Sequence, residues 1–166
     1  MSLWMNSTAR VQAFALCLVF SMSTALASQT VTQDANTHRV RQAFADWQQG
    51  KGSVFDLLAP DAKWTVAGSS PVSAVYGSKA DLMDQAVRPI SARLAKPISP
   101  TVQSIVAEGD VVVVLWRGEA TALDHKPYNN TYLWHMTFKD GQVIDVKAFL
   151  DTYVLNDLMT RVRPGR

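Results

Sequence analysis

Residues 128–138 constrain the fold more than any other segment, because they alternate between two kinds of side chain. The even positions are mainly large and apolar: Tyr128, Asn130, Tyr132, Trp134, Met136 and Phe138. The odd positions are mostly polar. Successive side chains of a β-strand point to opposite faces, so the pattern predicts a strand whose aromatic face points inward. The strand must belong to a sheet that covers an apolar interior.

The neighbouring segments predict further antiparallel strands at 101–107, 110–121 and 142–151. The second contains an uninterrupted β-branched run, Val111 to Val114, which favours a strand over a helix. Asp140-Gly141 between the last two strands is a strong hairpin signal. From Thr101 onward the chain is therefore expected to form a four-stranded meander.

Helices are expected before this meander. Apolar residues with helical spacing predict a helix over 35–49, and Ser53 caps a short second helix. A strand at 62–67 and a loop follow. Ser78 caps a third helix over 79–95, in which Pro89 introduces a bend. Helices followed by strands predict an α+β fold, a curved antiparallel sheet packed on three helices.

The N-terminus has the three parts of a secretory signal peptide. Arg10 precedes an apolar core, Val11–Phe20, and Ala25-Leu26-Ala27 offers a cleavage site. We expect export to a bacterial periplasm, with a buried N-terminal helix as the alternative. The apolar core is too short for a comfortable membrane span, so no stable membrane insertion is expected after cleavage.

The predicted boundaries follow from this reading. Residues 1–27 are the signal peptide, 28–36 a flexible segment, 37–160 the domain, and 161–166 a basic tail that we expect to be frayed. The only cysteine, Cys17, leaves with the signal peptide. The mature domain therefore needs no disulfide to fold.

Charge and motifs narrow the classes of function. The formal net charge is only +2 and basic residues are scattered, which disfavours nucleic acid as a partner. No two of the three histidines have the spacing of metal ligands, so we expect no metal site. The sequence contains no glycine-rich phosphate loop and no serine in a nucleophile-elbow motif, and no cofactor is expected.

The order of elements resembles the nuclear transport factor 2-like superfamily, and its SnoaL-like members in particular. The likeness is carried by Phe44 to Gly50, by Gly68-Ser69-Ser70-Pro71, by Tyr128 to Trp134, and by Phe149-Leu150-Asp151-Thr152. It spans about 38–160. The resemblance implies a cone-shaped α+β domain with one apolar pocket, as in ketosteroid isomerases, limonene-epoxide hydrolases and polyketide cyclases.

The residues of the isomerase mechanism are not matched. Thr65 stands where that family places its aspartate base, and Trp134 stands where it places a protonated aspartate. The SnoaL-like pattern is better matched, because Asp151 falls where those members place an acid/base near the end of the last strand. Epoxide hydrolases of this fold use an arginine and two carboxylates, and Arg117, Glu119 and Asp151 are available by type.

Five residues form the expected site. Trp64, Asn130, Tyr132 and Trp134 would line the pocket and bind the ligand, and Asp151 at its mouth would transfer a proton. Asn130 and Tyr132 could instead be satisfied by one another, by a neighbouring strand or by water. Asp151 could instead cap a helix that starts at Thr152. The apolar set that ends at Leu150 would turn it outward, unless a β-bulge near 147–149 reverses the faces.

Three functions remain open on the sequence alone. The first is a cofactor-free isomerase, cyclase or hydratase acting on a small hydrophobic ring compound through Asp151. The second is a non-catalytic periplasmic module that binds a small apolar molecule. The third is a structural dimer that uses the outer face of the sheet. A homodimer is also the oligomeric state that we expect in the first two cases.

Overall fold

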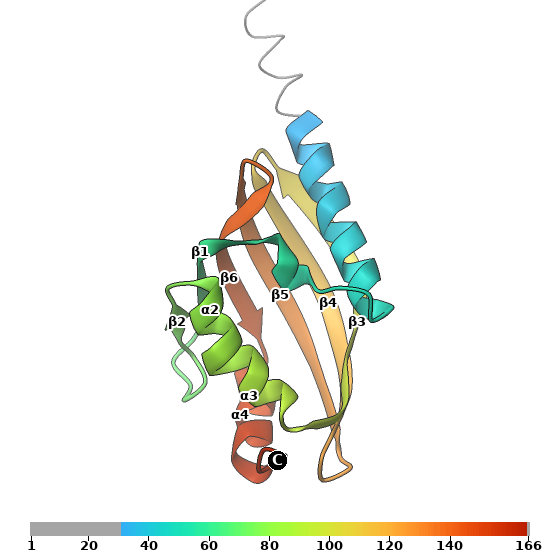
Figure 1. Cartoon of the computed structure of the whole chain (residues 1–166), viewed down its shortest axis with the longest axis vertical. Coiled ribbons are helices and arrows are strands. Elements are labelled where there is room, and N and C mark those ends of the chain that lie inside the picture. The colour runs from blue at the N-terminus through green and yellow to red at the C-terminus, as the bar shows by residue number, and fades with distance from the viewer. Residues whose placement is uncertain (1–30, 166) are drawn as a thin grey trace, which may run out of the picture.

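The computed structural model describes residues 31–165. The expected signal peptide, 1–27, lies outside the described residues, as do the first residues of the 28–36 segment. Residues 31–36, which were expected to be loose, are helical and continue into the helix that ends at residue 48. This long helix has no printed label in Figure 1 and is called the N-terminal helix below.

One curved six-stranded sheet organises the domain, in the order β2-β1-β6-β5-β4-β3. All neighbouring strands are antiparallel except β1 and β6, which are parallel. The chain therefore has the expected α+β architecture, with one parallel pair added to the meander. The strands are β1 (Leu58–Val66), β2 (Val75–Tyr76), β3 (Leu94–Glu108), β4 (Val111–Ala122), β5 (Pro127–Lys139) and β6 (Gln142–Leu150).

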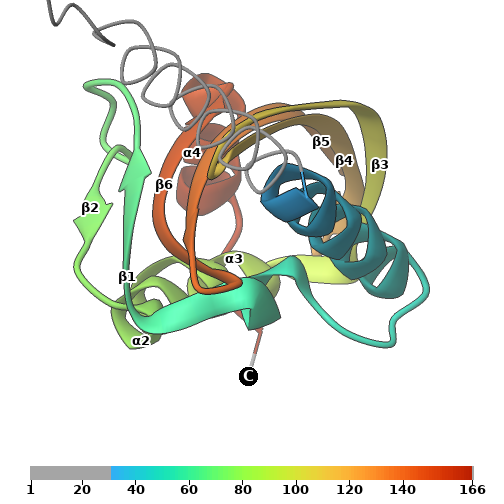
Figure 2. The same cartoon turned by 90° about the horizontal axis from the view of Figure 1, so that it is seen from above.

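The helices cover the concave side of the sheet at two levels (Figure 1). The N-terminal helix lies within the arch of β3, β4 and β5, as the view from above shows (Figure 2). The second group crosses in front of the other end of the sheet, and α4 follows β6. The helical elements that follow the N-terminal helix are η1 (Val54–Leu57), α2 (Lys79–Leu82), η2 (Met83–Val87), α3 (Arg88–Ser91) and α4 (Thr152–Arg161).

The alternation in β5 is confirmed. All even residues from Tyr128 to Phe138 are buried, whereas the odd ones are exposed or half-buried. The Asp140-Gly141 turn to β6 is also confirmed, with positive φ angles of 51° and 78°. Two positive φ angles in succession are what the preferred hairpin turn requires, and its twist matches that of the strands.

Strand β3 begins at Leu94, seven residues before the expected start at Thr101. Pro97 and Pro100, which were expected to end the preceding segment, lie inside the strand. Proline has no N–H to donate, but β3 is an edge strand, where one side of the backbone needs no partner. The pairing with β4 shifts register between Lys96 and Ser99.

The third expected helix is continuous but contains a wide turn. After α2 the chain forms a π-helix, η2, in which the N–H of Arg88 donates to the carbonyl of Met83. Proline at position 89 cannot donate the next backbone hydrogen bond, so an irregular turn before it is expected. This widening lies against the cavity described below.

Strand β6 settles the question of which way Asp151 faces. A register shift occurs between Thr137 and Phe138, so that the extra residue of β6 lies near the hairpin. Pairing is then regular through 147–149, and Val146 and Ala148 are buried. Residues 147–149 therefore contain no bulge that would turn Asp151 inward, and Asp151 is exposed.

The basic tail is anchored, which corrects the expectation of a frayed end. Helix α4 includes Arg161, whose guanidinium pairs with Asp124 and Asp157. Val162 is buried, and its carbonyl accepts a hydrogen bond from Arg93 Nε at 2.9 Å. The Gly165 N–H donates to the carbonyl of Ala92 at 2.7 Å. These bonds tie the C-terminal segment to the end of α3.

Candidate functional site

A cavity of about 470 Å³ lies between the concave face of the sheet and the helical segment that runs from α2 to α3. Its lining is drawn from almost every element of the fold. The aromatic part consists of Trp47, Phe55, Trp64, Tyr76, Trp116, Tyr132 and Trp134. The aliphatic part includes Leu82, Met83, Val87, Ile98, Leu150, Leu155 and Met159.

The aromatic side chains form a connected floor. Trp64 and Trp134 meet edge to face, with ring centroids 4.9 Å apart. Trp116 contacts Trp134 in the same way at 4.8 Å and stacks on Tyr132 at 4.0 Å, with the two planes only 9° apart. Rings locked in this way offer rigid edges and faces to a planar ligand. The even positions of β4 and β5 supply three of these four rings.

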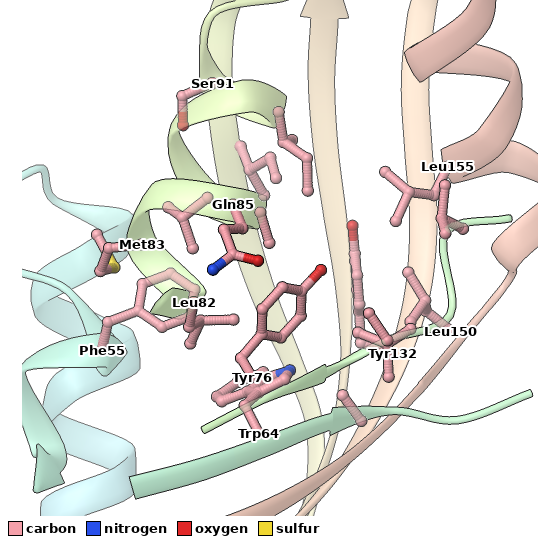
Figure 3. Close-up of a pocket in the computed structure, with 18 of the residues that line it drawn as sticks. Phe55, Trp64, Tyr76, Leu82, Met83, Gln85, Ser91, Tyr132, Leu150 and Leu155 are labelled. Atoms are coloured by element: carbon pink, nitrogen blue, oxygen red, sulfur yellow. The ribbon is translucent and has the colours of Figure 1, made fainter. Parts of the chain in front are cut away.

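Three neutral polar groups approach the same open space (Figure 3). They are the hydroxyls of Tyr76 and Tyr132 and the amide of Gln85, which comes from the π-helical turn. Partial burial raises the pKa of Tyr76 above its ordinary value of 10. Burial, together with the neighbouring Tyr128, raises the pKa of Tyr132 well above 10. Both phenols are therefore protonated, uncharged hydrogen-bonding groups at neutral pH.

Tyr132 is connected to a second buried tyrosine. Its hydroxyl lies 3.1 Å from that of Tyr128, which is buried and does not line the cavity. Burial raises the pKa of Tyr128, while the hydroxyl of Tyr132 and the side chain of Asn130 act in the opposite direction. The negative charge of Asp151 raises it further.

Asn130 fastens β5 to the end of β6. Its Nδ2 donates to the carbonyl of Asp151 at 2.9 Å, and its Oδ1 accepts from the N–H of Asp151 at 3.0 Å. The regular pairing of the two strands ends at Tyr132 and Leu150, so this amide replaces the next pair of backbone hydrogen bonds. A buried amide in this position satisfies backbone groups that would otherwise have no partner.

Asp151 is the N-cap of α4. Its Oδ1 accepts from the N–H groups of Tyr153 at 3.0 Å and Val154 at 3.2 Å. It lines a separate, smaller pocket of about 240 Å³ together with Arg117, Asn129, Asn130, Thr131 and Val154. Arg117 pairs with Glu119 at 3.4 Å. Both of these side chains are about half exposed, at 51% and 61%.

The structure thus separates the five residues singled out in the sequence. Trp64, Tyr132 and Trp134 line the large cavity, whereas Asn130 and Asp151 line the smaller pocket. Sequence reasoning missed Tyr76 and Gln85. The usable signal for Gln85 was its position on the helix just before Pro89, where the turn widens toward the cavity.

The electrostatics of the cavity are those of an uncharged site. None of the lining residues is Asp, Glu, His, Lys, Arg or Cys. Within residues 31–165, acidic, histidine and cysteine side chains form no group that could hold a metal ion. No helix in that part of the chain is both long and apolar enough to cross a membrane. The arrangement can enclose a molecule, stack against it and hydrogen-bond it.

Solved structures share this fold. Bal32a from a soil-derived mobile gene cassette has a TM-score of 0.65 and 19% identity, and the match covers 77% of this chain and 98% of Bal32a. A nuclear transport factor 2-like protein of unknown function from Burkholderia pseudomallei has a TM-score of 0.64 and 21% identity, over 76% and 98%. TerC, co-crystallised with polyporic acid, has a TM-score of 0.59 and 17% identity, over 75% and 98%.

No curated protein matches the sequence significantly. The family comparison is decisive, because it covers most of the domain from the N-terminal helix to the middle of β6. The model of the SnoaL-like domain matches residues 40–146, and this chain therefore belongs to the SnoaL-like domain family.

Proposed function

We propose that this protein is a non-catalytic binding module that holds one small, uncharged ring compound in the large cavity. The observation that carries the proposal is the composition of the lining. A cavity of about 470 Å³ is surrounded by aromatic and aliphatic side chains and by a few neutral polar groups, without a charged residue. Sites that bind small apolar molecules have this composition: apolar walls with a small number of placed polar groups.

The aromatic floor favours a flat ligand. Trp64, Trp116 and Trp134 present edges and faces that are held by one another, so they lose little conformational freedom when a ligand binds. Aromatic pairs add to the free energy of binding beyond the buried area when they stack or meet edge to face. A planar ring system would gain both contributions.

The alternative, a cofactor-free acid/base enzyme, needs a group that exchanges a proton near neutral pH. Asp151, the residue expected to do so, caps α4 from the smaller pocket. The hydroxyl groups that do line the cavity belong to serines and to Tyr76 and Tyr132, and the pKa of each tyrosine is raised. The lining therefore supports binding better than proton transfer.

The fold is compatible with a bound small molecule. TerC, which shares the fold at a TM-score of 0.59, was co-crystallised with polyporic acid. At 17% identity this likeness concerns the fold alone, and the ligand of the present chain is argued from its own lining residues.

Export to a bacterial periplasm is part of the proposal, with a mature chain that begins after Ala27. Secretion of the full-length chain in a Gram-negative host, followed by intact-mass measurement of the periplasmic fraction, tests it. The expected mass is that of residues 28–166. Recovery of the uncleaved chain in the cytoplasm would contradict it.

A homodimer through the outer sheet face completes the proposal. Val106 on β3, Leu133 on β5 and Phe149 on β6 expose 66%, 37% and 52% of their surfaces. Exposed apolar side chains gathered on one sheet suit self-association. Light scattering should give the mass of a dimer for the wild type and that of a monomer for Phe149→Asp, because the substitution places a charge in the proposed interface. A monomeric wild type would contradict this part.

Binding itself is tested with an uncharged fluorescent probe, N-phenyl-1-naphthylamine. The wild type should bind it with micromolar affinity and shift its emission to the blue. Ala86→Phe, which fills the cavity from η2, should weaken binding at least about tenfold. The matched control is Ala80→Phe on α2, where the residue is exposed and outside the lining. A wild type that fails to bind, or equal affinity in Ala86→Phe, would contradict the proposal.

A further inference from the structure

We propose that the ligand is an uncharged aromatic ring that bears a flexible alkyl tail. The ring lies against the tryptophans, and the tail extends into a second, aliphatic half of the cavity. This inference rests on the proposed binding function and adds the chemical class of the ligand. It also assigns a binding role to helix α4, because Leu155 and Met159 line the aliphatic half.

The lining of the cavity is drawn from two hydrophobic clusters. The first cluster holds all of the aromatic lining residues, together with aliphatic residues such as Leu82 and Val87. The second contributes only aliphatic residues to the lining, and Ile98 and Leu150 pack against both clusters. The lining residues that belong to the second cluster alone are Val72, Ile90, Leu94, Leu155 and Met159. The cavity therefore has an aromatic half and an aliphatic half.

The two halves follow one another along the strands. In the aromatic half, Trp116 on β4 is paired with Tyr132 on β5. In the aliphatic half, Leu94 on β3 is paired with Ala122, which lies six residues further along β4. Six residues of a strand correspond to about 20 Å. The lining therefore extends well beyond one aromatic ring, and a ligand that uses both halves must be elongated.

The helical wall of the cavity runs between the same two ends. Ile90 follows Met83 by seven residues, which is about 10 Å along a helix. Figure 3 shows Met83 and Phe55 on one side of the open space and Leu155 on the other. Met83 therefore lies at the aromatic end, with Phe55 of the first cluster. Met159 belongs to the second cluster and lies at the aliphatic end, with Leu155 and Ile90.

The two halves favour different parts of a ligand. The tryptophan rings present rigid edges and faces to a planar group, whereas the aliphatic half offers no ring for stacking. Methionine has an unbranched side chain that adapts to a flexible chain, and each CH₂ group buried there should strengthen binding about threefold to fourfold. A charged tail would lose its hydration without gaining a partner, because no lining residue is charged. This excludes an ordinary fatty acid.

The experiment compares 4-methylphenol with 4-hexylphenol, two uncharged molecules that differ only in the length of the tail. Their dissociation constants are measured by displacement of N-phenyl-1-naphthylamine and by calorimetry, and the ratio of methyl over hexyl reports on the tail. Met159→Trp fills the aliphatic half, and Met83→Trp makes the same change at the aromatic end. Both methionines are half-buried. Ala80→Phe, exposed and outside the lining, is the surface control.

In the wild type the ratio should be about one hundred or more, because the longer phenol buries five further CH₂ groups. Met159→Trp should lower the ratio at least about tenfold and leave the affinity for 4-methylphenol within about twofold of the wild type. Met83→Trp should weaken both phenols and keep the ratio within about twofold, and Ala80→Phe should change neither affinity. Val72→Trp fills the aliphatic half from the loop before β2 and should repeat the result of Met159→Trp, including where Met159→Trp fails to fold.

Two results would overturn the inference while the binding function stands. The first is a ratio that Met159→Trp and Val72→Trp leave unchanged, or that Met83→Trp lowers as much as they do. The second is a wild type that binds N-phenyl-1-naphthylamine but neither phenol. If the wild type binds neither the phenols nor N-phenyl-1-naphthylamine, the binding function and this inference fall together.

Discussion

Apart from the buried Asn130, the residues that β4 and β5 contribute to the small pocket at Asp151 lie on the opposite face of these strands from those that line the large cavity. Trp116 and Tyr132 point into the cavity, whereas their neighbours Arg117 and Thr131 line the pocket on the other side. The cavity contains rings and neutral donors, and the pocket contains the charges. Because successive strand residues point to opposite faces, residues that are adjacent in sequence contribute to the apolar cavity and to the charged pocket.

This difference shows that a carboxylate near a cavity can have a structural role instead of a catalytic one. The backbone of Asp151 is hydrogen-bonded to Asn130, and its own carboxylate oxygen accepts two backbone N–H groups. A carboxylate used in this way stabilises the start of a helix. The proximity of an acid to an apolar pocket in sequence is therefore weak evidence for acid/base chemistry.

The largest expected effect separates the two faces of β4. Trp116→Ala removes a fully buried ring from the floor and should lower the free energy of unfolding by about 3–5 kcal/mol. Arg117→Ala, one residue away, removes an exposed side chain and should change it by less than about 0.5 kcal/mol. Urea unfolding followed by circular dichroism measures both. Equal losses would mean that the outer pocket is as important to the fold as the aromatic floor.

The second prediction concerns the space beside the floor. Gly118→Ala places a methyl group 2.9 Å from Ile98 and about as close to the two stacked rings, so the free energy of unfolding should fall by about 1–3 kcal/mol. Gly52→Ala is the control, because its added Cβ meets other atoms only at 3.6 Å or more. An unchanged stability of Gly118→Ala would show that the two rings can move apart, and that the aromatic floor is less rigid than its packing indicates.

Sequence reasoning recovered the fold because the strongest patterns are local. The even face of β5, the Asp140-Gly141 turn and the Ser53 and Ser78 caps each follow from one segment and its neighbours. What it missed depends on position in the whole sheet. Prolines 97 and 100 are tolerated only because β3 is an edge, and the parallel pairing of β1 with β6 is a long-range contact.

Strand alternation correctly predicted which aromatic residues face the cavity. Trp64, Tyr132 and Trp134 line the cavity because they lie on inward faces of their strands. Asp151 and Asn130 were harder, because both depend on where the register shift of β6 falls, and that shift lies near the hairpin. Gln85 reaches the cavity from a π-helical turn, which helical periodicity of 3.6 residues does not predict.

Alkaline pH offers a third test, specific to the cavity. The pKa of Tyr132 is raised well above 10, chiefly by burial, so the folded protein keeps this proton when the unfolded chain loses it. The free energy of unfolding should therefore be unaffected by Tyr132 below about pH 10 and fall above it, by about 1.4 kcal/mol per pH unit. Urea titrations from pH 8 to 11 should show this slope reduced in Tyr132→Phe.

The control for the alkaline test is Tyr153→Phe, whose ring is 81% exposed and which should keep the wild-type slope. Groups that do not contact Tyr132 contribute equally to all three proteins, so the difference between them isolates Tyr132 together with its hydrogen-bonded partner Tyr128. Identical slopes in the wild type and in Tyr132→Phe would mean that Tyr132 is solvated in the folded state.

The smallest effect is expected at Asp151. Asp151→Ala removes the cap of α4 and should cost about 1 kcal/mol of unfolding free energy, whereas Asp151→Asn keeps a capping oxygen and should cost a few tenths. Asp151→Asn should also bind N-phenyl-1-naphthylamine within about twofold of the wild type, because its side chain is outside the cavity lining. A folded Asp151→Asn that has lost the probe would place Asp151 in the ligand site after all. A charged residue would then belong to the ligand site, and an acid/base enzyme would be a better interpretation than a binding module.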